Sequence, residues 1–491
     1  MGSRGGREGG SAVGLALKAL AVSFMVATPL MGVWLASSLA AYANRATWLP
    51  VAAGALLFPG LPLAWDAVGE LRRRKSAKKR RRFLTFFDRL VLRTLAVNLV
   101  FLVALLALFP ERGFLALSTR GDWALDGHHG PTAERTRRAL LRSAGALDWL
   151  YRWVRKNPYR HDDEKPTPTP KPNDRPRPPP RPTATPTGTS TTAPSGTSTA
   201  TPPPPPPSAP GTAPPYPMPA QIHPVVAAMP REAESSIEAV GRYIAEREHD
   251  PVQRVKALHD WVADRVAYDV PALRAPRIPQ SAGDARAVFA SRKGVCAGYA
   301  HLLAELGKVT GDEIVYVVGD ARSSDAPLAG EPHAWNAAKL GGAWYLIDAT
   351  WDAGSVGGDD FTKRYSTAYL FTPPDLFART HFADHTEWLL MAQPISRAEF
   401  FRRPVLSPEF FVHRLTLRSP DRAQVTAAGG LDLEIDNPDN LFIIVNYTPH
   451  GGGPKTACEG DRHTRLRCNF AAAGQYDVRI FMNREQYGSY A

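Results

Sequence analysis

The stretch that decides the fold is Gly294-Val295-Cys296-Ala297-Gly298-Tyr299-Ala300, which opens a run of apolar residues at helical spacing. Apolar residues at i, i+3, i+4 and i+7 predict a buried amphipathic helix, and here they are Tyr299, Leu302, Leu303 and Leu306. Lys293-Gly294 permits a tight turn just before that helix. We therefore expect Cys296 in the first helical turn, where the positive end of the helix dipole stabilises a thiolate.

Two short segments further along the chain supply an imidazole and a carboxylate. They are His333-Ala334-Trp335-Asn336 and Tyr345-Leu346-Ile347-Asp348-Ala349-Thr350-Trp351-Asp352. Both stretches have the character of short strands, and Gly341-Gly342 lies between them as a turn. Adjacent antiparallel strands would place His333 and Asp348 side by side. A thiol, an imidazole and a carboxylate together are the components of an activated cysteine nucleophile.

These motifs carry a family resemblance. The GVCxGYA, HAWN and YxxIDxTWD segments resemble the transglutaminase-like superfamily of papain-fold cysteine enzymes. The helical pattern that follows Asp250-Pro251 is similar to the helix preceding the catalytic cysteine in that superfamily. Downstream segments resemble its kyphoscoliosis-peptidase-like branch: Tyr369-Leu370-Phe371, His381-Phe382, Trp388-Leu389-Leu390 and Ser407-Pro408-Glu409-Phe410-Phe411.

The resemblance implies an α+β, papain-like catalytic domain with the triad Cys296, His333 and Asp348. It implies attack of the thiolate on a peptide or carboxamide carbonyl, followed by hydrolysis or transamidation of a thioester. It implies no cofactor. The competing interpretation is a non-catalytic cell-envelope scaffold or binding module that retains the fold.

Other residues near the motifs have more ordinary interpretations. Asp352 is the fallback orienting carboxylate, while His259 and His301 are expected to be structural. A zinc site is disfavoured because the chain has no Cys-x-x-Cys pair and no His-Glu-x-x-His motif.

The front of the chain predicts a multi-pass membrane region. Residues 19–41, 48–65 and 90–109 are apolar segments near the length needed to cross a bilayer. A dense basic cluster from Arg72 to Arg82 lies between the second and third, and such short basic loops remain cytoplasmic. The part of the chain after Phe109 is then extracytoplasmic. Ala41-Tyr42-Ala43 resembles a signal-peptide cleavage site, but we favour an uncleaved anchor because the apolar run is long.

Two segments follow the membrane region. An amphipathic helix is expected from Arg137 to Val154, lying on anionic headgroups or packed on the membrane bundle. From about Lys165 to Pro219 the composition is dominated by Pro, Thr, Ser, Ala and Gly, which cannot bury a core. We interpret this stretch as a disordered linker that tethers the enzyme.

The end of the chain predicts a second soluble domain. Short β-type runs separated by Gly, Pro and Asn turns favour a small all-β, immunoglobulin-like sandwich, and the alternative is that they complete the catalytic sheet. Of the three cysteines, Cys458 and Cys468 flank a polar turn and are expected to form a hairpin disulfide outside the membrane.

The charge balance fits this division of the chain. The formal charge of +12 is concentrated in the basic loop and the juxtamembrane arginines. No aromatic-interleaved basic surface favours nucleic acid as a partner. The expected partners are membrane lipids and a protein or peptide substrate, for which the predicted location suggests the cell envelope as the source. The predicted parts are a membrane region at 1–112, a juxtamembrane helical segment at 113–160, a linker at 161–219, a catalytic domain at 220–412 and a β-sandwich at 413–491.

Overall fold

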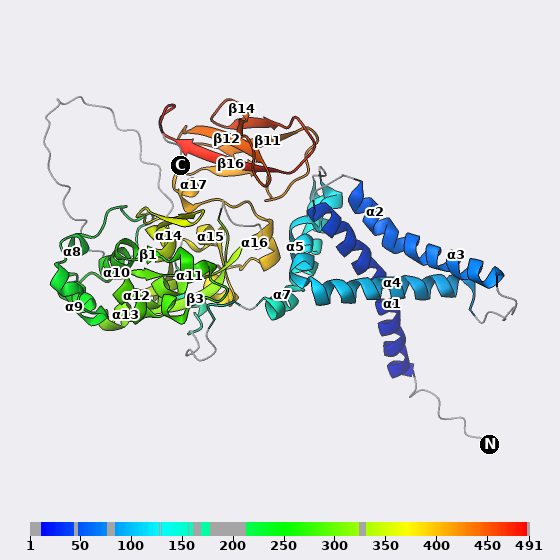
Figure 1. Ribbon diagram of the computed structural model, residues 1–491, viewed down its shortest axis with the longest axis horizontal. Helices are drawn as coiled ribbons and strands as arrows, with labels where there is room; N and C mark the ends of the chain where they lie inside the picture. Colours follow the sequence, from blue (N-terminus) through cyan, green and yellow to red (C-terminus); the bar gives the residue numbers. More distant parts are fainter. Residues whose placement is uncertain are drawn as a thin grey trace, which may run out of the picture. The chain divides into compact units, whose positions relative to one another are not determined.

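The computed structural model is a mixed α+β protein (Figure 1). It describes residues 11–43, 48–75, 84–126, 128, 130–155, 157–160, 168–176, 213–323 and 330–488. The chain forms two compact units. The first comprises Met1–Lys156, Ile395–Pro404 and Arg414–Ala491, and the second comprises Asn157–Pro394 and Val405–His413.

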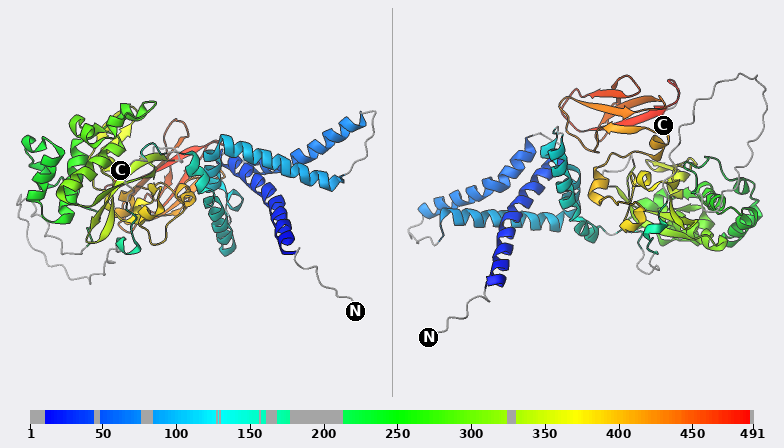
Figure 2. Two further views of the ribbon diagram at one scale, coloured as in Figure 1. Left: turned by 90° about the horizontal axis from the view of Figure 1, so that it is seen from below. Right: turned by 180° about the vertical axis from the view of Figure 1, so that it is seen from behind.

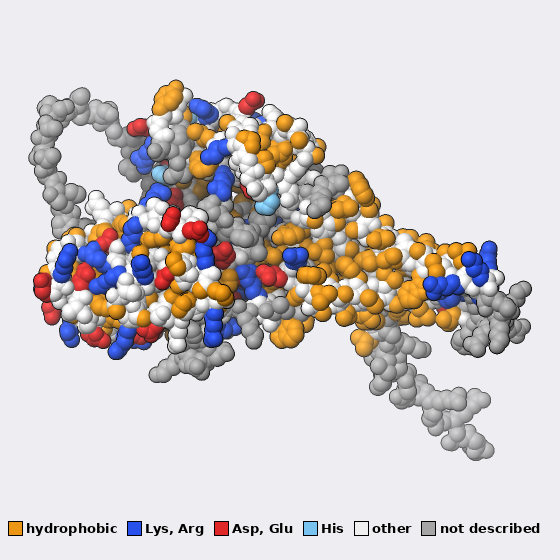
Figure 3. All heavy atoms as spheres, viewed as in Figure 1, with side chains coloured by type: hydrophobic (Ala, Val, Ile, Leu, Met, Phe, Trp, Pro, Cys, Tyr) orange, Lys and Arg blue, Asp and Glu red, His pale blue; other side chains and the backbone are white. Residues whose placement is uncertain are grey.

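The first unit begins with long apolar helices (Figures 1 and 2). They are α1 (Ser11–Tyr42), α2 (Leu49–Ala55), the π-helical turn η1 (Leu56–Gly60), α3 (Leu61–Arg74) and α4 (Phe86–Leu108). Three segments are long and apolar enough to cross a membrane: Val22–Tyr42, Leu49–Arg74 and Phe86–Leu108. Hydrophobic side chains cover the visible face of this region (Figure 3). Most of the basic loop, residues 76–83, lies outside the described residues.

The second of these segments is bent where Pro59 interrupts it. Proline lacks the N–H that a helix interior needs, and Phe58 just before it has non-helical backbone angles. Further along the same segment, Asp66 on α3 accepts hydrogen bonds from Arg89 and Arg93 on α4. This ion-paired carboxylate joins the two helices.

The juxtamembrane segment consists of several short helices. They are α5 (Pro110–Arg120), the 3-10 turn η2 (Trp123–Leu125), α6 (Pro131–Gly145) and α7 (Asp148–Val154). The single amphipathic helix expected from Arg137 to Val154 is therefore two helices, broken at Ala146 and Leu147. Tyr151 packs against Phe114 of α5 and Phe401 of α16 (Arg397–Arg402). The Tyr151 ring of α7 is thus buried in protein, whereas the Trp149 and Trp153 side chains of the same helix are exposed.

The second unit holds the predicted catalytic residues. Its helices and 3-10 turns are η3 (Pro172–Asp174), α8 (Pro224–Ala227), η4 (Arg231–Glu234), α9 (Ile237–Arg247), α10 (Pro251–Arg265), α11 (Val270–Arg274), η5 (Gln280–Ala282), α12 (Ala285–Ser291), α13 (Cys296–Thr310), α14 (Ala349–Ala353), α15 (Pro374–Phe377), η6 (Thr386–Leu389) and α17 (Pro408–Val412). Its strands are β1 (Ala267–Tyr268), β2 (Lys293–Gly294), β3 (Ile314–Ala321), β4 (Glu331–Leu340), β5 (Ala343–Ile347), β6 (Gly354–Gly357), β7 (Asp360–Lys363), β8 (Leu370–Thr372) and β9 (His381–Ala383).

A five-stranded antiparallel sheet organises this unit. Its strand order is β8-β5-β4-β3-β9, and α13 packs against β3 and β4. The turn between β4 and β5 uses Gly341 and Gly342, both with positive φ, as the sequence predicts. The expected helix after Asp250-Pro251 is α10, and the Asp250 carboxylate caps its N-terminus by accepting from the N–H groups of Val252 and Gln253. The Trp261 side chain of α10 is fully buried in the core.

Residues on both sides of the Pro/Thr/Ser-rich segment contact this same unit. On one side, the Asn157 side chain donates to the carbonyl of Gly319. On the other, Met218 is buried and its carbonyl accepts from Thr367. The described residues on both sides of the segment therefore belong to the second unit. Residues 161–167 and 177–212 themselves lie outside the described part of the chain.

The C-terminal part of the first unit is built from strands. They are β10 (Thr416–Ser419), β11 (Gly430–Asp436), β12 (Phe442–Pro449), β13 (Thr456–Ala457), β14 (Glu459–Gly460), β15 (Arg465–Asn469) and β16 (Tyr476–Asn483). They form two sheets with the orders β10-β11-β15-β14 and β13-β12-β16. None of these described strands joins the five-stranded sheet, so the alternative that they complete it is wrong.

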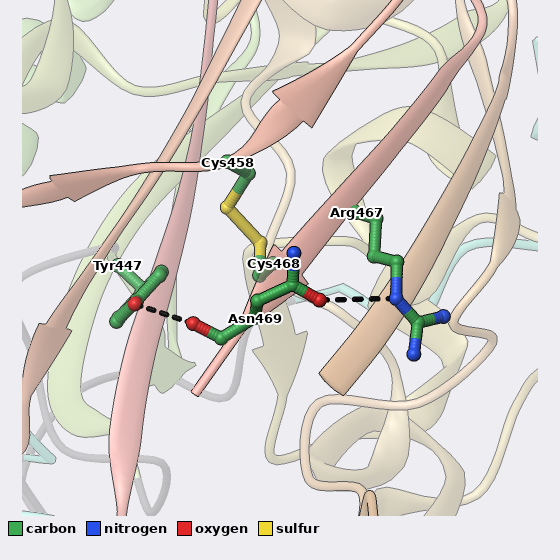
Figure 4. Close-up of a disulfide and its surroundings, with 5 residues drawn as sticks. All are labelled: Tyr447, Cys458, Arg467, Cys468 and Asn469. Carbon is green, nitrogen blue, oxygen red and sulfur yellow. Dashed lines mark hydrogen bonds between the residues drawn. A yellow bond between two sulfur atoms is a disulfide. The ribbon is translucent and has the colours of Figure 1, made fainter. Parts of the chain in front are cut away.

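The predicted disulfide is present in these sheets. Cys458 and Cys468 are bonded, with Cα atoms 4.3 Å apart (Figure 4). Cys458 directly precedes β14, which pairs antiparallel with β15, so the two cysteines lie across a hairpin. The Asp461 carboxylate accepts backbone hydrogen bonds from His463, Thr464 and Arg465, and it thereby fixes the turn between them.

Candidate active site

Cys296 is the first residue of α13, where the sequence places it. Its side chain is buried, with 1% of its surface exposed. Close packing around the helix start explains the glycine in the motif. A Cβ at Gly298 would lie 2.5 Å from the carbonyl oxygen of Ala282 and 2.6 Å from Val288. Only glycine fits there without moving the backbone that holds the cysteine.

His333 and Asp348 come from neighbouring strands. β4 carries His333, while Asp348 directly follows β5, and the two strands pair with Asn336 opposite Ile347. The His333 Nε2 atom lies 2.7 Å from Asp348 Oδ2, and the Cys296 side chain lies near enough for its charge to raise the pKa of His333. Since Nε2 faces the carboxylate, Nδ1 is the ring nitrogen left for the thiol. The structure thus brings Cys296, His333 and Asp348 into one connected chain.

The charges in this chain stabilise one another. Burial alone would lower the pKa of His333, but the negative charges of Asp348 and Cys296 outweigh burial and raise it to about 10. Burial would raise the pKa of Asp348, yet the His333 charge and the hydrogen bonds from His333 and His381 hold that pKa well below its usual range. An imidazolium beside a carboxylate is therefore the favoured state, and a thiolate is its natural counter-ion.

Asp348 is held by four donors. Its Oδ1 accepts the backbone N–H groups of Thr350 and Trp351, which caps α14. Its Oδ2 accepts from His333 and, at 3.0 Å, from His381 Nε2. Two backbone bonds and two imidazole bonds leave the carboxylate little rotational freedom, so it can fix the orientation of His333.

His381 is a site residue to which the sequence assigns no role. It is fully buried on β9 and stacks on Phe377, with ring centroids 4.1 Å apart. Burial lowers the pKa of His381 to about 4, so the ring is neutral. Because its Nε2 must carry the proton donated to Asp348, its Nδ1 is left to accept from the Thr380 hydroxyl at 2.9 Å. No local sequence pattern indicates that β9 lies beside Asp348, and the pairing of β9 with β3 brings it there.

His333, Asp348 and His381 are also the types of residue that bind metals. Their ligand atoms all lie within 4.8 Å of one another. However, Asp348 Oδ2 already accepts both imidazole N–H groups, and a metal would require both rings to turn lone pairs toward it. The raised pKa of His333 opposes the loss of that proton. The donor set therefore fits a hydrogen-bond network better than a metal centre.

Two tyrosines lie directly at the cysteine. Tyr268, at the end of β1, packs against the buried cluster that contains Cys296. Tyr159 is a member of that cluster. Neither tyrosine could be found from the motifs. Tyr268 is brought to the cysteine by the pairing of β1 with β2, and Tyr159 comes from the segment before the Pro/Thr/Ser-rich stretch.

Asp352 belongs to a separate buried network. Its Oδ2 lies 3.1 Å from His259 Nε2, and the other nitrogen of that ring lies 3.0 Å from Asp260 Oδ1. Asp260 also accepts from Lys256 and from Tyr365. Asp352 therefore orients His259 and does not take the fallback role of orienting His333.

His301 has structural surroundings, as expected. Its Nδ1 lies 2.7 Å from the Gly283 carbonyl, and its ring stacks on that of Tyr316.

Comparison with known proteins finds a family model that matches the part of the chain carrying the site. The profile of the transglutaminase-like superfamily matches residues 238–349. Mouse kyphoscoliosis peptidase is 30% identical over 208 residues, which cover 40% of this chain and 31% of that protein. The human kyphoscoliosis peptidase is 28% identical over 224 residues, covering 44% of this chain and 34% of that protein. The chain thus spans about a third of the length of these curated relatives.

Solved structures match over shorter stretches. A candidate cysteine protease from Cytophaga hutchinsonii is 24% identical, covers 23% of this chain and 36% of its own, and has a TM-score of 0.20. A structure described as a TGase is 20% identical, covers 28% of this chain and 36% of its own, and has a TM-score of 0.21.

Proposed function

We propose that the chain is a cysteine peptidase or acyltransferase, because residues 238–349 match the model of the transglutaminase-like superfamily. Cys296 is the nucleophile, His333 the general base and then acid, and Asp348 the residue that orients His333. The single observation that carries this proposal is the buried hydrogen bond between His333 and Asp348, beside the Cys296 side chain at the start of α13.

The reaction proceeds through a thioester. The Cys296 thiolate attacks a peptide or carboxamide carbonyl, the C–N bond breaks, and His333 gives its proton to the departing amine. The acyl group then passes to water or to a second amine, and His333 removes a proton from that nucleophile. Hydrolysis and transamidation share all of these residues, so the acceptor decides between the two reactions.

Two donors at the thiol can stabilise the tetrahedral oxyanion. One is the backbone N–H of Cys296 at the start of α13. The second is the Tyr268 hydroxyl, since Tyr268 packs against the buried cluster that contains Cys296 and can donate to a substrate oxygen. Together they would form the usual pair of donors for acyl transfer.

The test is capture of the acyl-enzyme. The full chain in detergent is incubated with a carboxamide or peptide library, quenched in acid, and analysed by mass spectrometry for an adduct on the Cys296 peptide. Hydroxylamine should release the adduct, because thioesters are cleaved by it. Cys296→Ala should give no adduct. A fold that serves only as a scaffold, the competing function, would give none with the parent chain either.

We propose that the catalytic unit is extracytoplasmic. The first support is the basic cluster between the second and third apolar segments, which positive-inside topology keeps in the cytoplasm. The second support is the Cys458–Cys468 disulfide, since such bonds persist in oxidising compartments. On this basis the substrate would be an envelope protein or peptide, and the C-terminal sheets would be an immunoglobulin-like binding module.

A further inference from the structure

The segment Asn157–Arg160 lies on the active site, although it precedes the superfamily domain by a long stretch of sequence. Tyr159 has only 4% of its surface exposed. It belongs to a buried cluster with Val295, Cys296, Ala297, Ala300 and Ala334. An aromatic side chain from outside the domain therefore fills the apolar surroundings of the thiol.

Contacts on both sides of Tyr159 hold the segment in place. The Asn157 side-chain amide donates to the Gly319 carbonyl at 3.0 Å, and the Tyr316 hydroxyl donates to the Tyr159 carbonyl at 2.7 Å. Arg160 forms an ion pair with Asp384 at 2.9 Å. The backbone carbonyl and the flanking side chains are thus bound much as a short peptide ligand is bound by a protein groove.

This arrangement conflicts with catalysis. The Tyr159 side chain packs in the same buried cluster as Cys296, so it occupies space that a reacting carbonyl needs. A substrate carbon must come within about 3.5 Å of the sulfur before the bond can form. The segment and a substrate therefore exclude each other.

We propose that Asn157–Arg160 is an internal peptide ligand that occupies the substrate cleft and holds the enzyme inactive until it leaves. The cleft accordingly accepts a peptide chain with an aromatic side chain beside the thiol. This inference rests on the proposed function. Whether the segment occupies the cleft, however, can be measured without measuring turnover.

The experiment measures how fast Cys296 is alkylated. Cys296 is the one free cysteine, so iodoacetamide reports on it alone when the disulfide is intact. In the full chain in detergent, Tyr159→Ala should raise the alkylation rate about tenfold, the increase expected if the parent cleft is open about a tenth of the time. Arg175→Ala is the matched control, because Arg175 donates to the Ala392 carbonyl on the same unit and away from the thiol. It should leave the rate unchanged.

A charge swap guards against misfolding of the Tyr159 variant. Arg160→Glu should raise the alkylation rate, and combining it with Asp384→Arg should bring the rate back toward that of the parent. A synthetic peptide of residues 155–162 should slow alkylation of the Tyr159→Ala chain, whereas a scrambled peptide should not. Together these results would establish occupancy of the cleft by sequence-specific contacts.

Two outcomes overturn the proposal. One is alkylation of Tyr159→Ala within twofold of the parent rate. The other is slower alkylation, which would mean that Tyr159 supports the reactive thiol. Failure of the proposed function gives a different result: the Tyr159→Ala thiol opens to iodoacetamide but forms no acyl-enzyme with any carboxamide.

Discussion

Replacing Asp348 by Asn tests how the charge at the active site is maintained. Burial by itself lowers the pKa of His333, so the charges of Asp348 and Cys296 must supply the whole rise to about 10. If losing the carboxylate charge lowers the pKa of His333 by about two, the imidazolium is destabilised by about 3 kcal/mol. Its acid dissociation constant then rises by a factor of about a hundred. The equilibrium between the thiolate–imidazolium pair and the neutral pair should shift toward the neutral pair by a similar factor.

The hydrogen bonds at this position amplify the effect. An Asn side chain that keeps its oxygen on the Thr350 and Trp351 N–H groups must turn its NH2 toward His333 and His381. His333 Nε2 would then have to accept, and the ring proton would move to the nitrogen that faces the thiol. In that tautomer the imidazole cannot take the thiol proton.

The assay is the rate of Cys296 alkylation against pH, measured in the parent and in the Tyr159→Ala background so that cleft access is held constant. Asp348→Asn should lower the rate near pH 7 about a hundredfold. Asp352→Asn is the matched control, since this carboxylate is equally buried on the same helix but contacts His259. An Asp348→Asn rate within threefold of the parent, in a chain that keeps its helical content, would refute the reasoning.

Four further outcomes follow from the same contacts. Tyr268→Phe should lower acyl-enzyme formation about a hundredfold while leaving alkylation unchanged, because it removes an oxyanion donor but no thiol contact; equal loss in both assays would contradict this. His381→Ala should reduce activity less than Asp348→Asn, because one of the four donors to Asp348 is lost, and a full loss would contradict that ranking. Burial alone would lower the pKa of His259, but hydrogen bonds to Asp260 and Asp352 raise it to about 9. That stabilisation is therefore complete below about pH 6.5 and is lost as the pH rises through 9, so amide-exchange protection of α10 should decrease from pH 7 to 10, and His259→Gln should flatten the decrease. Titration of thiols should find one before reduction and three after it, whereas three at the outset would exclude the disulfide.

The sequence predicts those parts of the site that depend on local patterns of residues. The spacing after Cys296 places the thiol at the start of α13, and the Gly341-Gly342 turn pairs the strands that bring His333 to Asp348. These are contacts between elements close in sequence. His381 and Tyr159 reach the same site through pairing of β9 with β3 and through contacts of an isolated segment. No periodicity in the sequence encodes such contacts.

The composition of the predicted linker does not show where its two ends attach. A Pro/Thr/Ser-rich stretch predicts that no core can form within it, but it says nothing about the contacts of the residues on either side. Asn157 and Met218 attach to one unit through Gly319 and Thr367.

The path of the chain around this segment has a consequence for activation by proteolysis. Tyr159 is joined to the domain that it covers through the residues leading to Met218, and such a covalent connection keeps a ligand at an effective concentration of about millimolar. A single cut between residues 177 and 212 would break this covalent connection, and the covering segment would then be held by its own contacts and by the first unit, which combines Met1–Lys156 with Ile395–Pro404 and Arg414–Ala491. Such a cut would loosen the hold on the thiol while keeping the two fragments together, without the loss of any residue of the catalytic domain.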